Sequence, residues 1–478
     1  MKIKIKMKIK KTALIAAVSA ALLLFVSCAA GDVPETSGTS DIISQEEITM
    51  SETETGAVSD VIDDGYTYCG DFGYIASGFE QKSGEQFSFR SGFEMQTKYA
   101  GDFNRFTLSY SSDAPLRCSI KYVSEDADGK RTEKTETFFL EEGIDKTFSS
   151  LIDGYARGVR AKSVELITAD TADKTRTRFS LKGFETDTAQ TYADGTFYIE
   201  NDRFRVGVLL DWGGGISYIE DKNDGDPSIT NLINHCDTGR LIQQSYYGVG
   251  NGKYYTGAKY GDNNWNYNPV QGGDQYGNPS KIVDFRLSDD GKSLYIKAQP
   301  MDWAQKNQPC PAYMENTYTL LEDGIRVDNR FVDFFGVPHP KTHQELPAFY
   351  VISNLGVFHY YNGTKPWTKD AYITLPDEPF WAGKGSAYHN VVAGNTETWA
   401  AWTNTDGYGI GLYVPGTEIM LAGRYEYNGS KSAADPATNY VAPLRSMNIV
   451  SFQPFSYSYV ITAGTVDQMR DVFAKYKN

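Results

Sequence analysis

The chain has 478 residues, 40% of them hydrophobic and 22% charged, which is enough apolar material for two to four domains and excludes a wholly disordered protein. Its 46 Lys and Arg against 61 Asp and Glu give a formal net charge of −15, which excludes a nucleic-acid-binding role that depends on a basic surface. The aromatic share of 14% indicates many β-strands, or rings on which a ligand stacks.

The first 27 residues have the pattern of an export signal. Six lysines precede an apolar run over 12–26, which is too short for a membrane-spanning helix. The run ends in the tetrapeptide Phe-Val-Ser-Cys at 25–28, which resembles a bacterial lipobox. That resemblance implies that Cys28 is lipidated and that the lipid anchors the exported protein to the cell envelope, at the cell surface or on the periplasmic face. The alternative is an ordinary signal peptide with an incidental cysteine.

Two segments with different compositions follow the signal. Residues 28–63 contain no aromatic residue and are rich in Ser, Thr, Glu and Gly, which predicts a flexible tether. Residues 64–187 contain short alternating runs, such as 105–110 and 118–123, separated by Gly, Asp and Ser. This pattern predicts an antiparallel, jelly-roll-like β-sandwich. It resembles the modules attached to secreted carbohydrate-active enzymes, which implies a carbohydrate-binding module; the alternative is a structural spacer.

A second, larger β region is predicted over 195–478. It consists of short strands and Gly/Asn/Tyr-rich loops without a fixed repeat, which excludes a propeller or solenoid and favours a large two-sheet sandwich. The exception is a helix predicted over 465–476, because Thr465 can cap it and its apolar residues fall on one face.

Two stretches of this region carry a family resemblance. The opening at 198–219, with its Gly213-Gly214-Gly215 run, and the later segment 407–415 are similar to strands of the galactose-mutarotase-like super-sandwich. The resemblance implies an all-β super-sandwich with a broad cleft and a role in carbohydrate chemistry. Because that fold serves sugar epimerases, polysaccharide lyases and domains of glycoside hydrolases, it does not choose among them.

The segment 237–247 is the densest candidate for sugar binding. If it is one strand, alternation places Arg240, Gln244 and Tyr246 on one face, where a guanidinium, an amide and a phenol can meet sugar hydroxyls. Asp237 begins the segment, and its Gly-Arg pair resembles the sugar-contacting strand of mutarotases. The alternative is a surface salt bridge of Arg240 beside a Tyr-rich edge.

Two further stretches pair a carboxylate with an aromatic ring. The Gly/Asn-rich loop 265–278 contains Trp265 and Asp274, and the dipeptide Asp302-Trp303 follows it. Loops with so many rings and amides are typical of a sugar cleft; the alternative for the loop is a structural or calcium-binding role.

Three residues complete the candidate catalytic set. His343 and Glu345 are two apart, so on a strand they share a face and can form an acid/base pair. The alternative for His343 is a hydrogen-bonded structural histidine next to a proline turn. Glu315 lies in a predicted strand. The alternative to a catalytic role is that it is an ordinary solvent-exposed strand residue. A hydrolase would use two carboxylates from Glu345, Glu315 and Asp274, with Asp237 and Asp302 as second choices.

A lyase would instead use His343 or Tyr246 as base, with Arg240 neutralising a uronate carboxylate. Both mechanisms require that these residues converge on one cleft.

We therefore expect an exported lipoprotein that binds and cleaves an extracellular glycan, as a glycoside hydrolase or polysaccharide lyase. The alternatives are a non-catalytic glycan-binding lipoprotein and, less favoured, a sugar mutarotase. No motif for a cofactor, a metal or a nucleotide stands out, so we expect no cofactor or metal, no nucleic-acid partner, contact with the membrane through the lipid alone, and a monomer.

Overall fold

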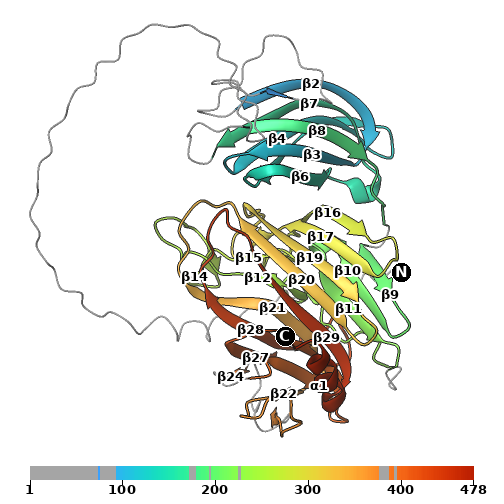
Figure 1. Cartoon of the computed structure of the whole chain (residues 1–478), viewed down its shortest axis with the longest axis vertical. Helices are drawn as coiled ribbons and strands as arrows, with labels where there is room; N and C mark the ends of the chain where they lie inside the picture. The colour runs from blue at the N-terminus through green and yellow to red at the C-terminus, as the bar shows by residue number, and fades with distance from the viewer. Residues whose placement is uncertain are drawn as a thin grey trace, which may run out of the picture.

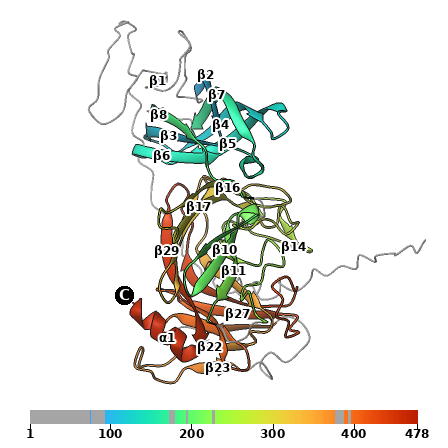
Figure 2. The ribbon, with the colours of Figure 1, turned by 90° about the vertical axis from the view of Figure 1, so that its right-hand side faces the viewer.

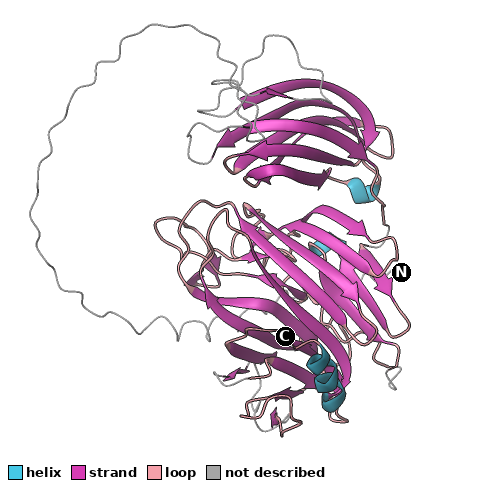
Figure 3. Cartoon of the chain, in the orientation of Figure 1, coloured by secondary structure: helices cyan, strands magenta, loops and turns pink. Residues whose placement is uncertain are grey.

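The computed structural model describes residues 74–75, 93–171, 179–192, 195–223, 228–375, 387–391 and 396–477 (Figure 1). The predicted signal peptide, the lipidation of Cys28 and the tether lie outside these residues. The regular secondary structure of the described residues is almost all β-strand (Figure 3), which confirms the all-β prediction.

The first part is a β-sandwich of two four-stranded sheets. Strands predicted at 105–110 and 118–123 are present as β3 (Arg105–Ser112) and β4 (Leu116–Glu125). Alternate residues of β4, from Leu116 to Tyr122, are buried in the core between the two sheets. One sheet is, in order, β1 (Tyr74–Ile75), β8 (Phe179–Asp187), β3 (Arg105–Ser112) and β6 (Gly143–Leu151). The other is β2 (Phe93–Phe103), β7 (Arg160–Thr171), β4 (Leu116–Glu125) and β5 (Arg131–Leu140).

The second part is built on a ten-stranded and a nine-stranded sheet, with a short hairpin beside them. The ten-stranded sheet contains β24 (Ala387–Val391), β27 (Ile419–Tyr425), β28 (Thr438–Met447), β21 (Thr342–Ile352), β12 (Ile242–Ser245), β11 (Gly215–Asp221), β10 (Phe204–Leu209) and β9 (Thr196–Glu200), with β15 (Pro269–Val270) and β18 (Met301–Asp302) attached at β12. The nine-stranded sheet is β16 (Lys281–Leu287), β17 (Ser293–Gln299), β19 (Ala312–Leu320), β20 (Ile325–Asp333), β29 (Phe455–Thr465), β26 (Tyr408–Tyr413), β25 (Trp399–Thr403), β22 (Val357–Tyr360) and β23 (Ile373–Leu375). The hairpin is β13 (Lys259–Tyr260) and β14 (Asn263–Asn264).

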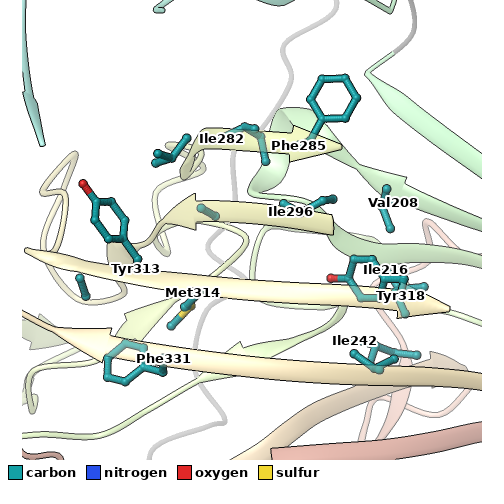
Figure 4. Close-up of a cluster of buried hydrophobic side chains, with 14 of the residues drawn as sticks. Val208, Ile216, Ile242, Ile282, Phe285, Ile296, Tyr313, Met314, Tyr318 and Phe331 are labelled. Atoms are coloured by element: carbon teal, nitrogen blue, oxygen red, sulfur yellow. The ribbon is translucent and has the colours of Figure 1, made fainter. Parts of the chain in front are cut away.

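The main core lies between the two large sheets. Figure 4 shows Ile216 and Ile242 of the ten-stranded sheet beside Tyr318 of the nine-stranded sheet, and all three are buried. The Tyr318 hydroxyl donates to the Gly214 carbonyl at 2.7 Å, within the glycine run. Gly213 has φ 62° and a Cβ there would lie 1.9 Å from the Gln271 carbonyl oxygen, so this close approach requires glycine.

The single α-helix of the described residues, α1 (Val466–Lys475), confirms the predicted C-terminal helix. Thr465 caps it by accepting a hydrogen bond from the Gln468 backbone amide, and the Gln468 side chain completes a capping box. In the described part of the chain, no helix has the length and apolarity needed to cross a membrane.

Cys236 and Cys310 are thiols and are not joined by a disulfide.

The β-sandwich is fastened to the nine-stranded sheet by polar and aromatic contacts. Strand β6 faces β16 across the junction (Figure 2). The Phe139 amide donates to the Tyr313 hydroxyl at 2.7 Å, and the Phe139 ring stacks on Phe334 with centroids 5.2 Å apart. Ion pairs Lys281–Glu136, Arg330–Glu141 and Arg105–Asp284 also cross the junction. The first sandwich is therefore held in one orientation against the second part.

A buried ion pair holds α1 to the rest of the nine-stranded layer. Arg470 donates two hydrogen bonds to Glu397, at 2.7 and 2.5 Å, and the Glu397 side chain is fully buried. The indole of Trp399 also donates to Glu397, at 2.5 Å. The carboxylate is thus fully compensated, and removal of its cation would leave a buried charge.

This pair gives the first prediction. Arg470→Met leaves Glu397 without its cation, so we expect the free energy of unfolding to fall by about 3–5 kcal/mol in urea denaturation. Arg326→Met is the matched control, because it breaks an exposed pair with Asp328 at 2.8 Å and should change stability by less than about 1 kcal/mol. Equal losses of unfolding free energy in both variants would show that burial of the Arg470–Glu397 pair does not increase its contribution to stability.

Candidate functional site

A pocket opens on the face of the ten-stranded sheet that points away from the main core. Its base is a separate hydrophobic cluster that includes Ala348, Leu421 and Tyr440. The pocket has a volume of about 130 Å³, well below the several hundred Å³ of a drug-sized ligand site. It therefore has room for one small ring.

Glu345 is the carboxyl group at the base of this pocket. It lies on β21, opposite Ser245 of β12, and is 8% exposed. Its Oε1 accepts hydrogen bonds from the Tyr440 hydroxyl at 2.6 Å and the Tyr247 hydroxyl at 3.2 Å. Burial raises the pKa of Glu345, although these hydrogen bonds oppose the shift.

The two phenols beside Glu345 stay protonated. Burial, followed by the nearby Glu345 charge, raises the pKa of both Tyr440 and Tyr247 well above the ordinary value. Both hydroxyls therefore remain donors at neutral pH. A carboxyl with a raised pKa, beside donors and open to a pocket, can exchange a proton with a ligand.

Arg240 reaches the pocket with its charge already balanced. Its Nε lies 3.3 Å from Asp237 Oδ2, and its guanidinium also donates to the Pro436 carbonyl. Asp237 Oδ1 accepts from the Gly239 amide at 3.0 Å. The Arg240–Asp237 pair offers hydrogen-bonding groups without a net charge.

Aromatic rings form one wall of the pocket. The ring centroid of Tyr260 lies 5.2 Å from that of Trp265 and 6.3 Å from that of Trp303. The Trp265 indole donates to Asn268 at 3.2 Å, which fixes its orientation. A Cβ on Gly239 would lie 2.6 Å from the Trp303 ring, so the glycine of the Gly-Arg pair makes room for this wall. Such ring faces suit the apolar face of a sugar.

The structure corrects the prediction for Gln244 and Tyr246. Gln244, on β12, and Tyr246, the residue after its end, are fully buried on the core side, and the Tyr246 hydroxyl donates to Gln244 at 2.6 Å. The pocket receives Gln243, Ser245 and Tyr247 instead. The reason is local: β12 begins only at Ile242, and Arg240 lies in a preceding turn, closed by its amide bonding to the Asp237 carbonyl, so strand alternation does not extend back to it.

Asp274 has a structural position rather than a catalytic one. It is fully buried, and its Oδ1 accepts from the amides of Tyr276 and Asn278, both at 2.9 Å. Its Oδ2 accepts from the Asn307 amide at 2.6 Å. All these contacts organise the loops behind the pocket, which it does not line.

Asp302 also lies behind the pocket wall. It accepts a hydrogen bond from the buried Tyr255 hydroxyl, and from the Ala304 amide at 3.1 Å. Burial raises the pKa of Asp302 to about 6. Only its neighbour, Trp303, lines the pocket.

Glu315 and His343 do not join Glu345 in the pocket. Glu315 lies on the nine-stranded sheet, where it pairs with Arg330 at 2.8 Å and Lys297 at 3.6 Å. His343 is half-buried on β21 and does not line the pocket. The predicted convergence is thus wrong for these two residues as well as for Asp274 and Gln244. Of the predicted residues, the pocket brings together Asp237, Arg240, Trp265, Trp303 and Glu345.

Sequence reasoning missed the phenols that contact Glu345. Tyr440 lies 95 residues away along the chain, and nothing in its local sequence marks it. If alternation is counted from residue 237, Tyr247 falls on the opposite face from Arg240. The turn at 237–240 breaks this alternation, so both residues can line the same pocket.

The comparisons give distant likenesses. No family model and no curated protein matches the chain. Among solved structures, a galactose mutarotase-like protein of Lactobacillus casei is 11% identical, with a TM-score of 0.36, over 56% of this chain and 100% of that one. A galactose mutarotase related enzyme of Lactobacillus acidophilus is 10% identical, with a TM-score of 0.36, over 56% and 97%.

A third likeness is to an α-galactosidase of glycoside hydrolase family 36 from Geobacillus stearothermophilus. It is 12% identical, with a TM-score of 0.34, over 59% of this chain and 42% of that one. These likenesses are too distant to indicate an activity for this chain.

The raised pKa of Glu345 gives the second prediction. Because the folded protein binds this proton more tightly than the unfolded chain, the resulting stability is present below about pH 4.3 and is lost as the pH rises through the raised pKa. Glu345→Gln removes the charge and keeps an oxygen acceptor. We expect its free energy of unfolding to exceed that of the wild type increasingly as the pH rises above about 5, by up to about 1.4 kcal/mol per pH unit until the raised pKa is passed.

Urea denaturation across this pH range, with Glu315→Gln as the matched control, measures the effect. A stability difference for Glu345→Gln that does not vary with pH would show that the carboxyl is ionised with an ordinary pKa.

Proposed function

We propose that the pocket binds one sugar ring of an extracellular glycan, with Glu345 as its acid/base group. The observation that supports this most directly is the burial of Glu345 beside two donor phenols, in a pocket walled by Tyr260, Trp265 and Trp303. Aromatic faces, amide groups and one titratable carboxyl are what a site for chemistry on a sugar requires.

The charge balance of the pocket favours a neutral sugar. Arg240 is paired with Asp237, and the raised pKa of Glu345 favours its neutral form. A uronate carboxylate would therefore meet no unpaired cation in the pocket, which weakens the lyase mechanism with Arg240 as the neutralising group. Tyr246, the other predicted lyase base, is buried in the core.

The proposed chemistry is proton transfer to a sugar oxygen. Glu345, when protonated, donates its proton to a glycosidic or ring oxygen and, when ionised, takes a proton back. A hydrolase also needs a second carboxylate, and Asp237 is the other carboxylate that lines the pocket. Because Asp237 is held by Arg240 and the Gly239 amide, a binding-only role is the second candidate function.

The proposed location follows from the N-terminal sequence alone. The export signal and the lipobox-like tetrapeptide at 25–28 support a lipoprotein of the cell envelope. In that location the pocket would be accessible to glycans from outside the cell. Labelling of the expressed protein with a radioactive fatty acid, abolished in Cys28→Ala, would test it.

The third prediction concerns activity. We expect the full chain to act on a neutral oligosaccharide within a panel of plant, algal and host glycans, monitored by reducing ends and by the absorbance of unsaturated uronates. Glu345→Gln should lower turnover by about 10²–10⁴-fold, the usual contribution of a general acid or base, and leave sugar binding in calorimetry largely intact.

Glu315→Gln is the matched control, since it changes a carboxylate of the other sheet and should retain activity. Binding without any product from the wild type would establish the non-catalytic alternative. Full turnover in Glu345→Gln would overturn the acid/base assignment.

A further inference from the structure

A second and larger cavity lies between the first β-sandwich and the nine-stranded sheet. This interdomain groove has a volume of about 940 Å³, within the upper range for ligand sites. Its walls include Arg117, Thr137 and Phe139 from the sandwich, and Gln299, Phe335 and Phe452 from the second part. Neither part alone forms it.

One cation of the groove is uncompensated. Within the residues that the structure describes, the Arg117 side chain has no ion-pair or hydrogen-bond partner, and it is exposed. The other two charged groups of the lining, Lys281 and Glu136, pair with each other. Among the lining residues the charges sum to one positive, on a chain whose net charge is −15, and a positive charge at this place favours an anion.

The remaining lining suits a sugar chain better than an isolated ion. Phe335 and Phe452 are half-buried and line the groove, so part of each residue stays accessible to a ligand. Phe139, directly across the strand pair from Arg117, is held by its stacking on Phe334. Thr137, Gln299 and Gln308 add hydrogen-bonding groups. Rings and amides beside a guanidinium fit a carboxylate-bearing sugar, since Arg binds carboxylates through two parallel hydrogen bonds.

One loop connects the groove to the small pocket. Trp303 lines the pocket, and Gln308 and Pro309 line the groove. The loop is closed on itself, because the Asp302 amide donates to the Gln308 carbonyl at 2.9 Å. A single short loop therefore contributes to the lining of both cavities.

We propose that the interdomain groove binds an oligosaccharide that contains uronic acid, with Arg117 as the contact for its carboxylate. The class of ligand rests on the proposed function of the pocket. The first sandwich would then be half of a binding surface, and the glycan would be recognised at two places with different charge.

Calorimetry on the full chain tests this with two probes of equal length, tetragalacturonate and a neutral tetramer of galactose. We expect Arg117→Ala to weaken tetragalacturonate binding by about tenfold and to leave neutral-tetramer binding unchanged. Arg117→Lys should recover part of the affinity, and raising the salt concentration should weaken only the uronate probe.

Arg131→Ala is the matched control. It lies at the opposite end of the same β4–β5 strand pair, where it bonds to Glu125, about 25 Å away at the rise of a strand. It should bind tetragalacturonate as the wild type does. Thermal unfolding of both variants checks that the fold is kept.

Equal tetragalacturonate affinity in the wild type and Arg117→Ala, or no binding by the wild type, would overturn the groove proposal. Loss of that binding in Glu345→Gln alone would also overturn it, because the acidic sugar would then occupy the pocket. If the neutral tetramer fails to bind while Arg117 still controls uronate binding, the groove stands and the proposed function of the pocket falls.

Discussion

The packing of the ten-stranded sheet on the nine-stranded sheet decides which side of each strand is available for binding. One face of each strand is buried between the sheets, so only the opposite face can present its polar groups to a ligand. Along β12 and the residue that follows it, this constraint sends Gln244 and Tyr246 into the core and turns Gln243 and Ser245 towards the pocket. On β21, where the register shifts after Glu345, the same constraint leaves that carboxyl at the pocket base.

Burial of Glu345 links the stability of the fold to the proposed chemistry. A carboxyl in a poorly solvated site is held near its neutral form, and the phenols of Tyr440 and Tyr247 accommodate it without an opposing cation. This arrangement lowers stability at neutral pH, which a purely structural site would not require. Proton exchange with a ligand is a use that explains why such a group is placed there.

The junction between the two parts fixes the orientation of the sandwich and also forms the proposed binding groove. The pairs Arg330–Glu141 and Lys281–Glu136, with the Phe139–Phe334 stack, hold the sandwich in place. A fixed junction keeps Arg117 opposite the second part, so the groove is pre-formed rather than assembled on binding. The loop that begins at β18 contributes Trp303 to the pocket wall and Gln308 to the groove.

The sequence by itself determined the features that depend on neighbouring residues. Alternation marked β3 and β4, and Thr465 with Gln468 marked the start of α1, because these patterns act within a few residues. It also placed Glu345, Arg240 and Trp265 among the site candidates. Only the tertiary structure decided the rest: it buried Asp274 in a loop, paired Glu315 with Arg330 on the other sheet, and brought Tyr440 to Glu345. These outcomes depend on contacts between residues far apart in the chain, which strand order and register create and which no local pattern encodes.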